Sequence, residues 1–366
     1  MRKLLGAVRR AFVFSYFSLF IASCGGGRQP QPTVSREFAV VASQDNSISI
    51  YSIDSSSGKL ESPGTVLSGG STPISLAADR TGRFVYIANF TAGGVSAFSI
   101  NANSGTLTPV GSPVAAGSNP RSVAVHATGR FAYVANVGSG DIYTYGIDSS
   151  TGGLTQVAPP VTSVPGPLSL ALDPTGRFAY AVSTGSNTVS GFAIDGSTGN
   201  LTEVGGPVVV GTSPDFVMVH VSGKYVYVVN TGSQDISVFA IDPQNGSLTS
   251  VGSPVADQGT FPVAIAGDPS GQFVYVANFG SRDISAYTVD PRTGALSSIG
   301  QPVPTGTGPL SLNVDPSGRY LYVANSQADN ISVFAIDRTR GTLSSAGPPT
   351  PTGMVPSSVI TVAPVR

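Results

Sequence analysis

The chain has no tryptophan, one cysteine, two histidines and few charged residues among its 366 amino acids. It holds 19 Lys and Arg against 20 Asp and Glu, and charged residues make up only 11%. A charge this sparse and balanced argues against a nucleic-acid partner. Two histidines are too few for a histidine-rich copper cluster, so we expect no metal and no cofactor. A single cysteine also excludes a disulfide within the chain.

Glycine and proline are abundant instead. The chain has 45 Gly and 28 Pro, together about a fifth of its residues against roughly 12% in an average protein. Such an excess predicts many tight turns, because Gly accepts a positive φ and Pro presets φ. Hydrophobic residues reach 40% and are spread evenly, so a large buried core is expected.

The N-terminus differs in composition from the rest of the chain. Basic residues stand at Arg2, Lys3, Arg9 and Arg10, and the apolar run 11–22 follows them. This run is too short for a hydrocarbon core that needs about 20 residues. It suits the apolar region of a secretion signal.

The segment Ile21-Ala22-Ser23-Cys24 resembles the lipobox of bacterial lipoproteins, in which the cysteine is acylated and becomes the first residue. That resemblance implies a signal peptide over 1–23, lipidation of Cys24 and a Gly-, Pro- and Gln-rich flexible tether over 24–35. The protein would then be lipid-anchored in the cell envelope, at the outer membrane or cell surface. The alternative is an ordinary signal peptide whose cysteine is incidental.

A repeat of constant length fills the remainder. Prolines that precede short apolar runs are spaced by 47 or 48 residues, and they stand at Pro73, Pro120, Pro167, Pro214, Pro262, Pro309 and Pro356. A period this regular indicates a repeat architecture.

Each repeat contains four strand-like runs. The first, for example 168–172, follows the proline and ends at an Asp-Pro-Thr-Gly turn. The second is apolar on both faces and has the form Tyr-Val-Ala-Asn, as in 322–325. The third ends in an Asp-x-x-x-Gly-x-Leu turn, and a short fourth strand follows. Four antiparallel strands per repeat without helices predict an all-β, seven-bladed β-propeller.

The order of the strands predicts how the ring closes. Segment 38–60 begins with a second strand, because Val40 aligns with Tyr86. The last run, 356–362, is a first strand. We therefore expect the C-terminal strand to join the N-terminal blade of a propeller over 36–366, which removes the open edges that a line of blades would expose.

These motifs resemble a known family. The segments Asp315–Tyr320 and Tyr322–Asn325, followed by Ile-Ser-Val-Phe-Ala-Ile-Asp, look like the YVTN-repeat and lactonase-type seven-bladed propellers. The resemblance covers about residue 37 to the end. This family includes proteins similar to 6-phosphogluconolactonase and muconate-lactonizing cyclases. Its enzymes carry His, Arg and Glu near the starts of first strands and after second strands, where this chain mostly has Ser, Ala, Leu and Thr.

The candidate ligand-binding residues are those that break the repeat on one face. Arg121 and Asp215 are the only charged residues directly after a repeat proline, and we expect them at the mouth of the central channel. They would form either a binding site or a simple ion pair. Further candidates in the loops after second strands are Asp141, Asp235, Arg282 and Asp283, for which solvated loop charges are the alternative.

Two other sets of polar residues recur with the repeat. His126 and His220 take the position of turn aspartates in other repeats, so we expect them to cap turns. The asparagines that end second strands either line the channel mouth or hydrogen-bond the strand end; they are Asn89, Asn136, Asn230, Asn278 and Asn325.

The sequence leaves two functional readings and leaves enzymatic activity open. The first is a lipid-anchored envelope propeller that binds a small molecule or an envelope protein on its asparagine-bearing face, with a pure scaffold as a variant. The second is a lactonase. Hydrolysis of a lactone needs a base and an oxyanion-stabilising donor in one pocket.

Overall fold

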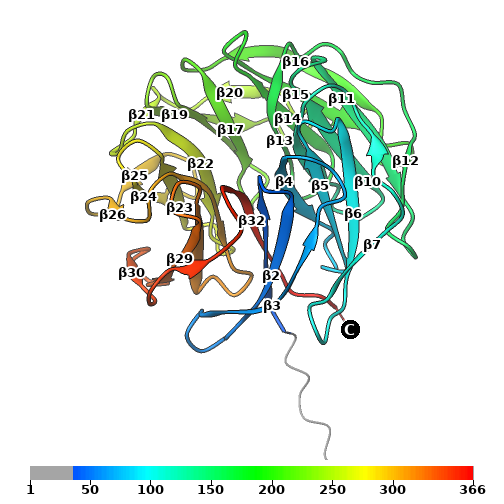
Figure 1. Ribbon diagram of the computed structural model, residues 1–366. Coiled ribbons are helices and arrows are strands. Elements are labelled where there is room, and N and C mark those ends of the chain that lie inside the picture. The colour runs from blue at the N-terminus through cyan, green and yellow to red at the C-terminus, as the bar shows by residue number, and fades with distance from the viewer. Residues whose placement is uncertain (1–35, 366) are drawn as a thin grey trace, which may run out of the picture. The chain divides into compact units, whose positions relative to one another are not determined.

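A computed structural model describes residues 36–365. Every regular element in this range is a strand, and the strands form seven antiparallel sheets arranged around a ring (Figure 1). No helix in the described range is long and apolar enough to cross a bilayer. The seven sheets around a ring confirm the predicted seven-bladed β-propeller. The signal segment 1–23, Cys24 and the tether 24–35 lie outside the described residues.

Each blade begins with an inner strand along the central channel. The repeat prolines open all seven of them: β4 (Pro73–Ala78), β9 (Pro120–Val125), β13 (Pro167–Leu172), β17 (Pro214–Val219), β22 (Pro262–Gly267), β27 (Pro309–Val314) and β32 (Pro356–Val362).

The second strand of each blade is fully buried, in agreement with its apolar sequence on both faces. These strands are β1 (Phe38–Ser43), β5 (Phe84–Asn89), β10 (Phe131–Asn136), β14 (Phe178–Ser183), β18 (Tyr225–Asn230), β23 (Phe273–Asn278) and β28 (Tyr320–Asn325). The third strands are β2 (Ser47–Ile53), β6 (Gly94–Ile100), β11 (Asp141–Ile147), β15 (Thr188–Ile194), β19 (Asp235–Ile241), β24 (Asp283–Val289) and β29 (Asn330–Ile336).

The outer edge of each blade is more variable. It is one strand in three blades: β3 (Leu60–Leu67), β12 (Leu154–Gln156) and β16 (Leu201–Val209). In the other four it consists of two short strands that both pair with the third strand. These pairs are β7 (Leu107–Pro109) with β8 (Val114–Ala115), β20 (Leu248–Ser250) with β21 (Val255–Ala256), β25 (Leu296–Ser298) with β26 (Val303–Pro304), and β30 (Leu343–Ser345) with β31 (Thr350–Pro351).

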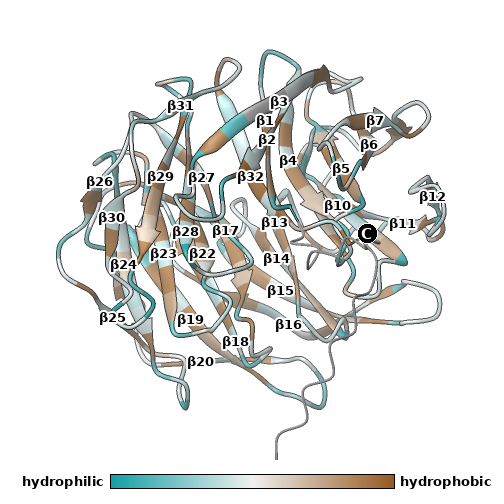
Figure 2. Cartoon of the chain, turned by 90° about the horizontal axis from the view of Figure 1, so that it is seen from below, coloured by the Kyte–Doolittle hydropathy of each residue, from teal (hydrophilic) through white to brown (hydrophobic). Residues whose placement is uncertain are grey.

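The ring closes as the strand order predicts. The last strand, β32, pairs antiparallel with β1, so that Phe38 faces Val362 and Val40 faces Ile360. The N-terminal blade therefore has the strand order β3-β2-β1-β32. Hydrophobic residues follow the strands and hydrophilic ones the connecting loops (Figure 2).

The repeated tyrosines join six of the seven blades to the next. In each case the buried Tyr hydroxyl donates to a glycine carbonyl in a turn of the following blade. The pairs are Tyr86–Gly152, Tyr133–Gly199, Tyr180–Gly246, Tyr227–Gly294, Tyr275–Gly341 and Tyr322–Gly58, at 2.8–3.1 Å. The last of these pairs crosses the closure of the ring. The tyrosines are thus interblade contacts, which explains why the sequence repeats them.

Candidate functional site

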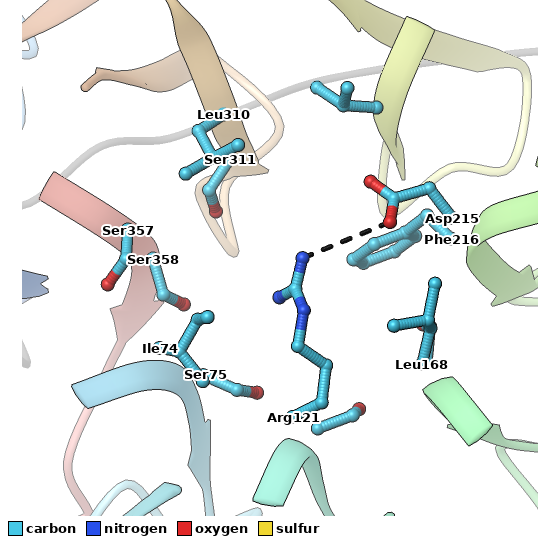
Figure 3. A pocket seen from close by; sticks show the side chains of 13 residues that line it. Ile74, Ser75, Arg121, Leu168, Asp215, Phe216, Leu310, Ser311, Ser357 and Ser358 are labelled. Atoms are coloured by element: carbon cyan, nitrogen blue, oxygen red, sulfur yellow. Dashed lines mark ion pairs between the residues drawn. The ribbon is translucent and has the colours of Figure 1, made fainter. Parts of the chain in front are cut away.

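A cavity opens in the channel where the inner strands begin (Figure 3). Its volume is about 70 Å³. The residue after the repeat proline lines it in all seven blades: Ile74, Arg121, Leu168, Asp215, Val263, Leu310 and Ser357. Four of these seven residues are apolar, and the other three are one cation, one anion and a serine.

Arg121 and Asp215 face each other inside this cavity although one blade separates them. One Arg121 guanidinium nitrogen (Nη2) lies 3.9 Å from Asp215 Oδ1, and the two side chains are 28% and 23% exposed. Burial raises the pKa of the Asp215 carboxyl above its ordinary value, and the Arg121 charge opposes this. At 3.9 Å the pair is an ion pair without a direct hydrogen bond, so each partner keeps hydrogen-bonding capacity.

The next residue along each inner strand joins neighbouring blades. In five blades it is a serine whose Oγ accepts the backbone N–H of the following inner strand, at 3.1–3.3 Å. These serines are Ser75, Ser122, Ser169, Ser311 and Ser358. The other two blades have Phe216 and Ala264, which have no hydroxyl. Phe216 lines the cavity beside Asp215 (Figure 3).

The predicted loop acids do not line this cavity. Asp141, Asp235 and Asp283 each accept a hydrogen bond from the Nδ2 of the asparagine that ends the preceding strand, at 2.8, 2.6 and 2.8 Å. The backbone N–H of Arg282 donates to Asn278 O at 2.9 Å. The structure thus places these four residues at the hairpins between second and third strands and brings only Arg121 and Asp215 together in the cavity.

The asparagine side chains are buried rather than displayed at the channel mouth. All five are 0% exposed. Each lies under a glycine of the loop that enters its own blade from the preceding one. A Cβ on Gly117 or Gly211, for example, would come within 2.8 Å of Asn136 or Asn230. Their hydrogen bonds run to the strand end and the adjoining hairpin, which is the second of the two alternatives predicted from the sequence.

The two histidines occupy turn positions. The Nδ1 of His126 accepts the backbone N–H of Thr128 at 3.2 Å, and its Nε2 donates to Gly176 O in the next blade at 2.7 Å. His220 repeats this arrangement with Ser222 and Gly271. Turn aspartates elsewhere accept backbone N–H groups in the same way. Burial lowers the pKa of His220, so that the histidine is kept neutral in its turn.

Sequence reasoning missed Phe216 and the ring of serines. The signal was present one position beyond Arg121 and Asp215, where five repeats have Ser and one has Phe. Its meaning depends on which strand edge faces the channel, and the repeat alone does not give this. No group of three or more His, Cys, Asp or Glu side chains that could hold a metal ion occurs within residues 36–365.

The fold and this cavity define the class of protein: a seven-bladed β-propeller with an ion pair at the mouth of its central channel. Residues 33–308 and 257–359 match the family model described as lactonase, 7-bladed beta-propeller. The chain therefore belongs to this family, as the sequence motifs predict. No curated protein sequence matches it.

Several solved structures share the fold. A putative 6-phosphogluconolactonase from Bacteroides uniformis has a TM-score of 0.80 at 19% identity, covering 90% of this chain and 100% of that one. A putative 6-phosphogluconolactonase from Bacteroides fragilis has a TM-score of 0.80 at 21% identity, covering 91% and 100%. The periplasmic gluconolactonase of Pseudomonas aeruginosa has a TM-score of 0.76 at 21% identity, covering 90% and 99%. At these identities the likeness establishes the fold.

Proposed function

We propose that this protein binds a lactone, or the hydroxy acid that the lactone becomes, at the Arg121–Asp215 pair, and that it hydrolyses the lactone there. The observation that carries the proposal is the ion pair itself. It is the only pair of opposite charges in a cavity that the repeat otherwise lines with apolar residues and serine. Membership of the lactonase family and fold-level likeness to a gluconolactonase favour this function over a scaffold.

The pair has the two groups that lactone hydrolysis requires. Asp215, as carboxylate, accepts a proton from a water molecule while the water oxygen attacks the lactone carbonyl carbon. Arg121 donates hydrogen bonds to the negative carbonyl oxygen of the tetrahedral intermediate. The ring C–O bond then breaks, and the leaving alkoxide takes the proton back from Asp215. The products are a hydroxycarboxylate and one proton released to solvent.

The raised pKa of Asp215 fits the role of base, because a carboxylate with a higher pKa removes a proton from water more readily. Arg121 would also hold the carboxylate of the product. If only this binding step occurs, the protein is a binding module for a small anionic or carbonyl-bearing ligand at the same site. An envelope protein remains the alternative partner on this face.

The place of action that we propose is the cell envelope, with attachment through an acylated Cys24. The lipobox-like segment 21–24 supports it, and one structural neighbour is described as a periplasmic gluconolactonase. A substrate outside the cytoplasm follows from this proposal.

The test is turnover of glucono-δ-lactone and γ-butyrolactone by the purified protein, followed as proton release at constant pH. We expect Asp215→Asn to lower kcat by about 10²–10⁴ and Arg121→Ala by about 10²–10³. Asp195→Asn is the matched control, since Asn101 fills the equivalent turn position and caps it in the same way. If neither lactone is hydrolysed or bound, or if His220→Ala abolishes activity while the two cavity variants retain it, the proposal is wrong.

A further inference from the structure

Exposed apolar side chains stand in or just before some of the inner strands, at positions where most other repeats have small or polar residues. Phe216 is the first. It stands in the register of the interblade serines, is 36% exposed, and lies beside Asp215 in the cavity (Figure 3). With Phe at this position, the blade lacks the serine Oγ that accepts a neighbouring backbone N–H in five other blades.

The second feature is the residue immediately before each repeat proline, whose φ is positive in every blade. Other repeats fill this position with Gly, Asn, Ser or Thr: Thr72, Asn119, Gly166, Ser213 and Gly308. Two repeats have Phe261 and Val355, at φ 59° and 52°. Bulky and β-branched residues are outliers in the left-handed region, because their side chains crowd the backbone. Thr72 shares this strain, whereas Phe261 and Val355 combine it with an apolar side chain.

Burial does not compensate for this strain. Phe261 is 56% exposed and Val355 is 37% exposed, and Met354 beside it is 62% exposed. Glycine at either position would relieve the backbone, as Gly166 and Gly308 do in their blades. Strained residues of this kind gather at functional sites, where the surrounding structure maintains them.

Phe261 and Val355 each stand two positions before a residue that lines the cavity. Phe261 directly precedes β22, whose Val263 lines the wall, and Val355 directly precedes β32, whose Ser357 lines it. Phe216, on β17, belongs to the blade adjoining that of Phe261. We call Phe216, Phe261, Met354 and Val355 the apolar rim. Phe216 lines the cavity, and the other three stand just before strands that line it.

We infer that the ligand is amphiphilic. Its lactone ring or carboxylate lies at Arg121 and Asp215, and a hydrocarbon substituent leaves the channel against the apolar rim. This inference rests on the proposed function. A polyhydroxylated lactone fits less well, because it has no hydrocarbon part to cover the apolar rim.

The experiment compares two lactones with the same ring and different chains, γ-butyrolactone and γ-dodecalactone, with glucono-δ-lactone as the polyhydroxylated probe. Dissociation constants are measured by calorimetry for the purified parent and for Phe261→Gly and Val355→Gly. The control is Val221→Ser, because Val221 is a 50% exposed apolar residue in the turn after His220, away from the cavity lining.

We expect the parent to bind γ-dodecalactone at least tenfold more tightly than γ-butyrolactone. Each glycine variant should reduce that ratio at least threefold and at the same time raise the thermal midpoint, since the left-handed strain is relieved. The control should leave the ratio unchanged. A simple loss of folding would instead lower the thermal midpoint and weaken the binding of both γ-lactones to the same extent.

The outcomes separate the two proposals. Equal affinity for the two γ-lactones, or a ratio that neither glycine variant changes, overturns the amphiphilic ligand. If Arg121→Ala still weakens the binding of γ-butyrolactone in that case, the proposed function stands without the amphiphilic ligand. If the protein prefers the longer chain but Arg121→Ala does not change the affinity, the apolar rim still binds the hydrocarbon chain, and the ion pair is not the site that binds the lactone ring. Absence of any lactone binding overturns both.

Discussion

Removal of the closing strand is the sharpest perturbation of this ring. Deleting 356–366 takes away β32, in which Val359 and Val362 are 2% and 4% exposed. Burial of each such side chain contributes about 1.5–3 kcal/mol, so the two together contribute about 3–6 kcal/mol. Against a typical free energy of unfolding of about 5–15 kcal/mol, this loss alone is large.

The deletion also leaves polar groups of β1 without partners. All six residues of β1 are buried, and the backbone edge of β1 on the channel side pairs only with β32. The Ser357 hydroxyl contacts Ala42 O and Pro73 O, at 3.1 and 2.7 Å. Each buried group left without a partner costs about 1–3 kcal/mol. We therefore expect cooperative destabilisation of the whole ring rather than fraying of one blade.

Thermal and urea unfolding of the protein starting at residue 36 would measure this. The matched control deletes only 364–366, which removes a single described backbone hydrogen bond, from Val365 N to Thr81 O. We expect the control to keep the midpoint of the parent within a few degrees and the longer deletion to be largely unfolded at 25 °C. Unchanged midpoints for both deletions would show that β32 does not close the fold.

Three further predictions follow from individual side chains. Tyr322→Phe should lower the free energy of unfolding by about 1–3 kcal/mol, because Gly58 O loses its buried donor; an unchanged urea midpoint would contradict the closure contact. Cys24→Ala should move the protein from the membrane to the soluble fraction of cells, and continued membrane association of the variant would exclude acylation at this residue. Lactone turnover should rise with pH through the raised pKa of Asp215, and Arg121→Ala should shift this rise to higher pH, because the charge that lowers the pKa is removed; a shift to lower pH would rule out Asp215 as the base.

One prediction concerns acid stability. The pKa of His220 is lower in the folded state than its ordinary value of 6.5, so the unfolded chain binds the proton more tightly. The corresponding stability is present above about pH 6.5 and is lost as the pH falls below it. We expect His220→Asp to show a smaller fall in thermal midpoint between pH 7 and pH 5 than the parent. An equal fall in both proteins would mean that His220 is not neutral in its turn.

Much of the fold could be read from the sequence. The proline spacing gives the number of blades, and the order of the runs at 38–60 and 356–362 gives the closure. These inferences hold because a repeat fixes equivalent backbone positions, and because the alternation of apolar residues reports the face that each strand buries. The role of the tyrosines as blade contacts follows from their register in the same way.

The site depended on the tertiary structure. From the sequence, Arg121 and Asp215 were the first candidates and the loop acids Asp141, Asp235 and Asp283 further ones, because all of them were expected on one face. Only packing shows that the loop acids are engaged by buried asparagines, while Arg121 and Asp215 meet across the channel. Arg121 and Asp215 belong to blades that are two repeats apart along the chain, so local sequence cannot specify that they meet.

Sequence alone therefore determined the repeated architecture, and the three-dimensional arrangement decided which departures from the repeat matter. Phe261 and Val355 are ordinary residues in the printed chain. They become significant only with their positive φ, their exposure and their place beside the cavity. The physical reason is that strand pattern is set by local periodicity, whereas strain and burial depend on contacts made when the ring closes.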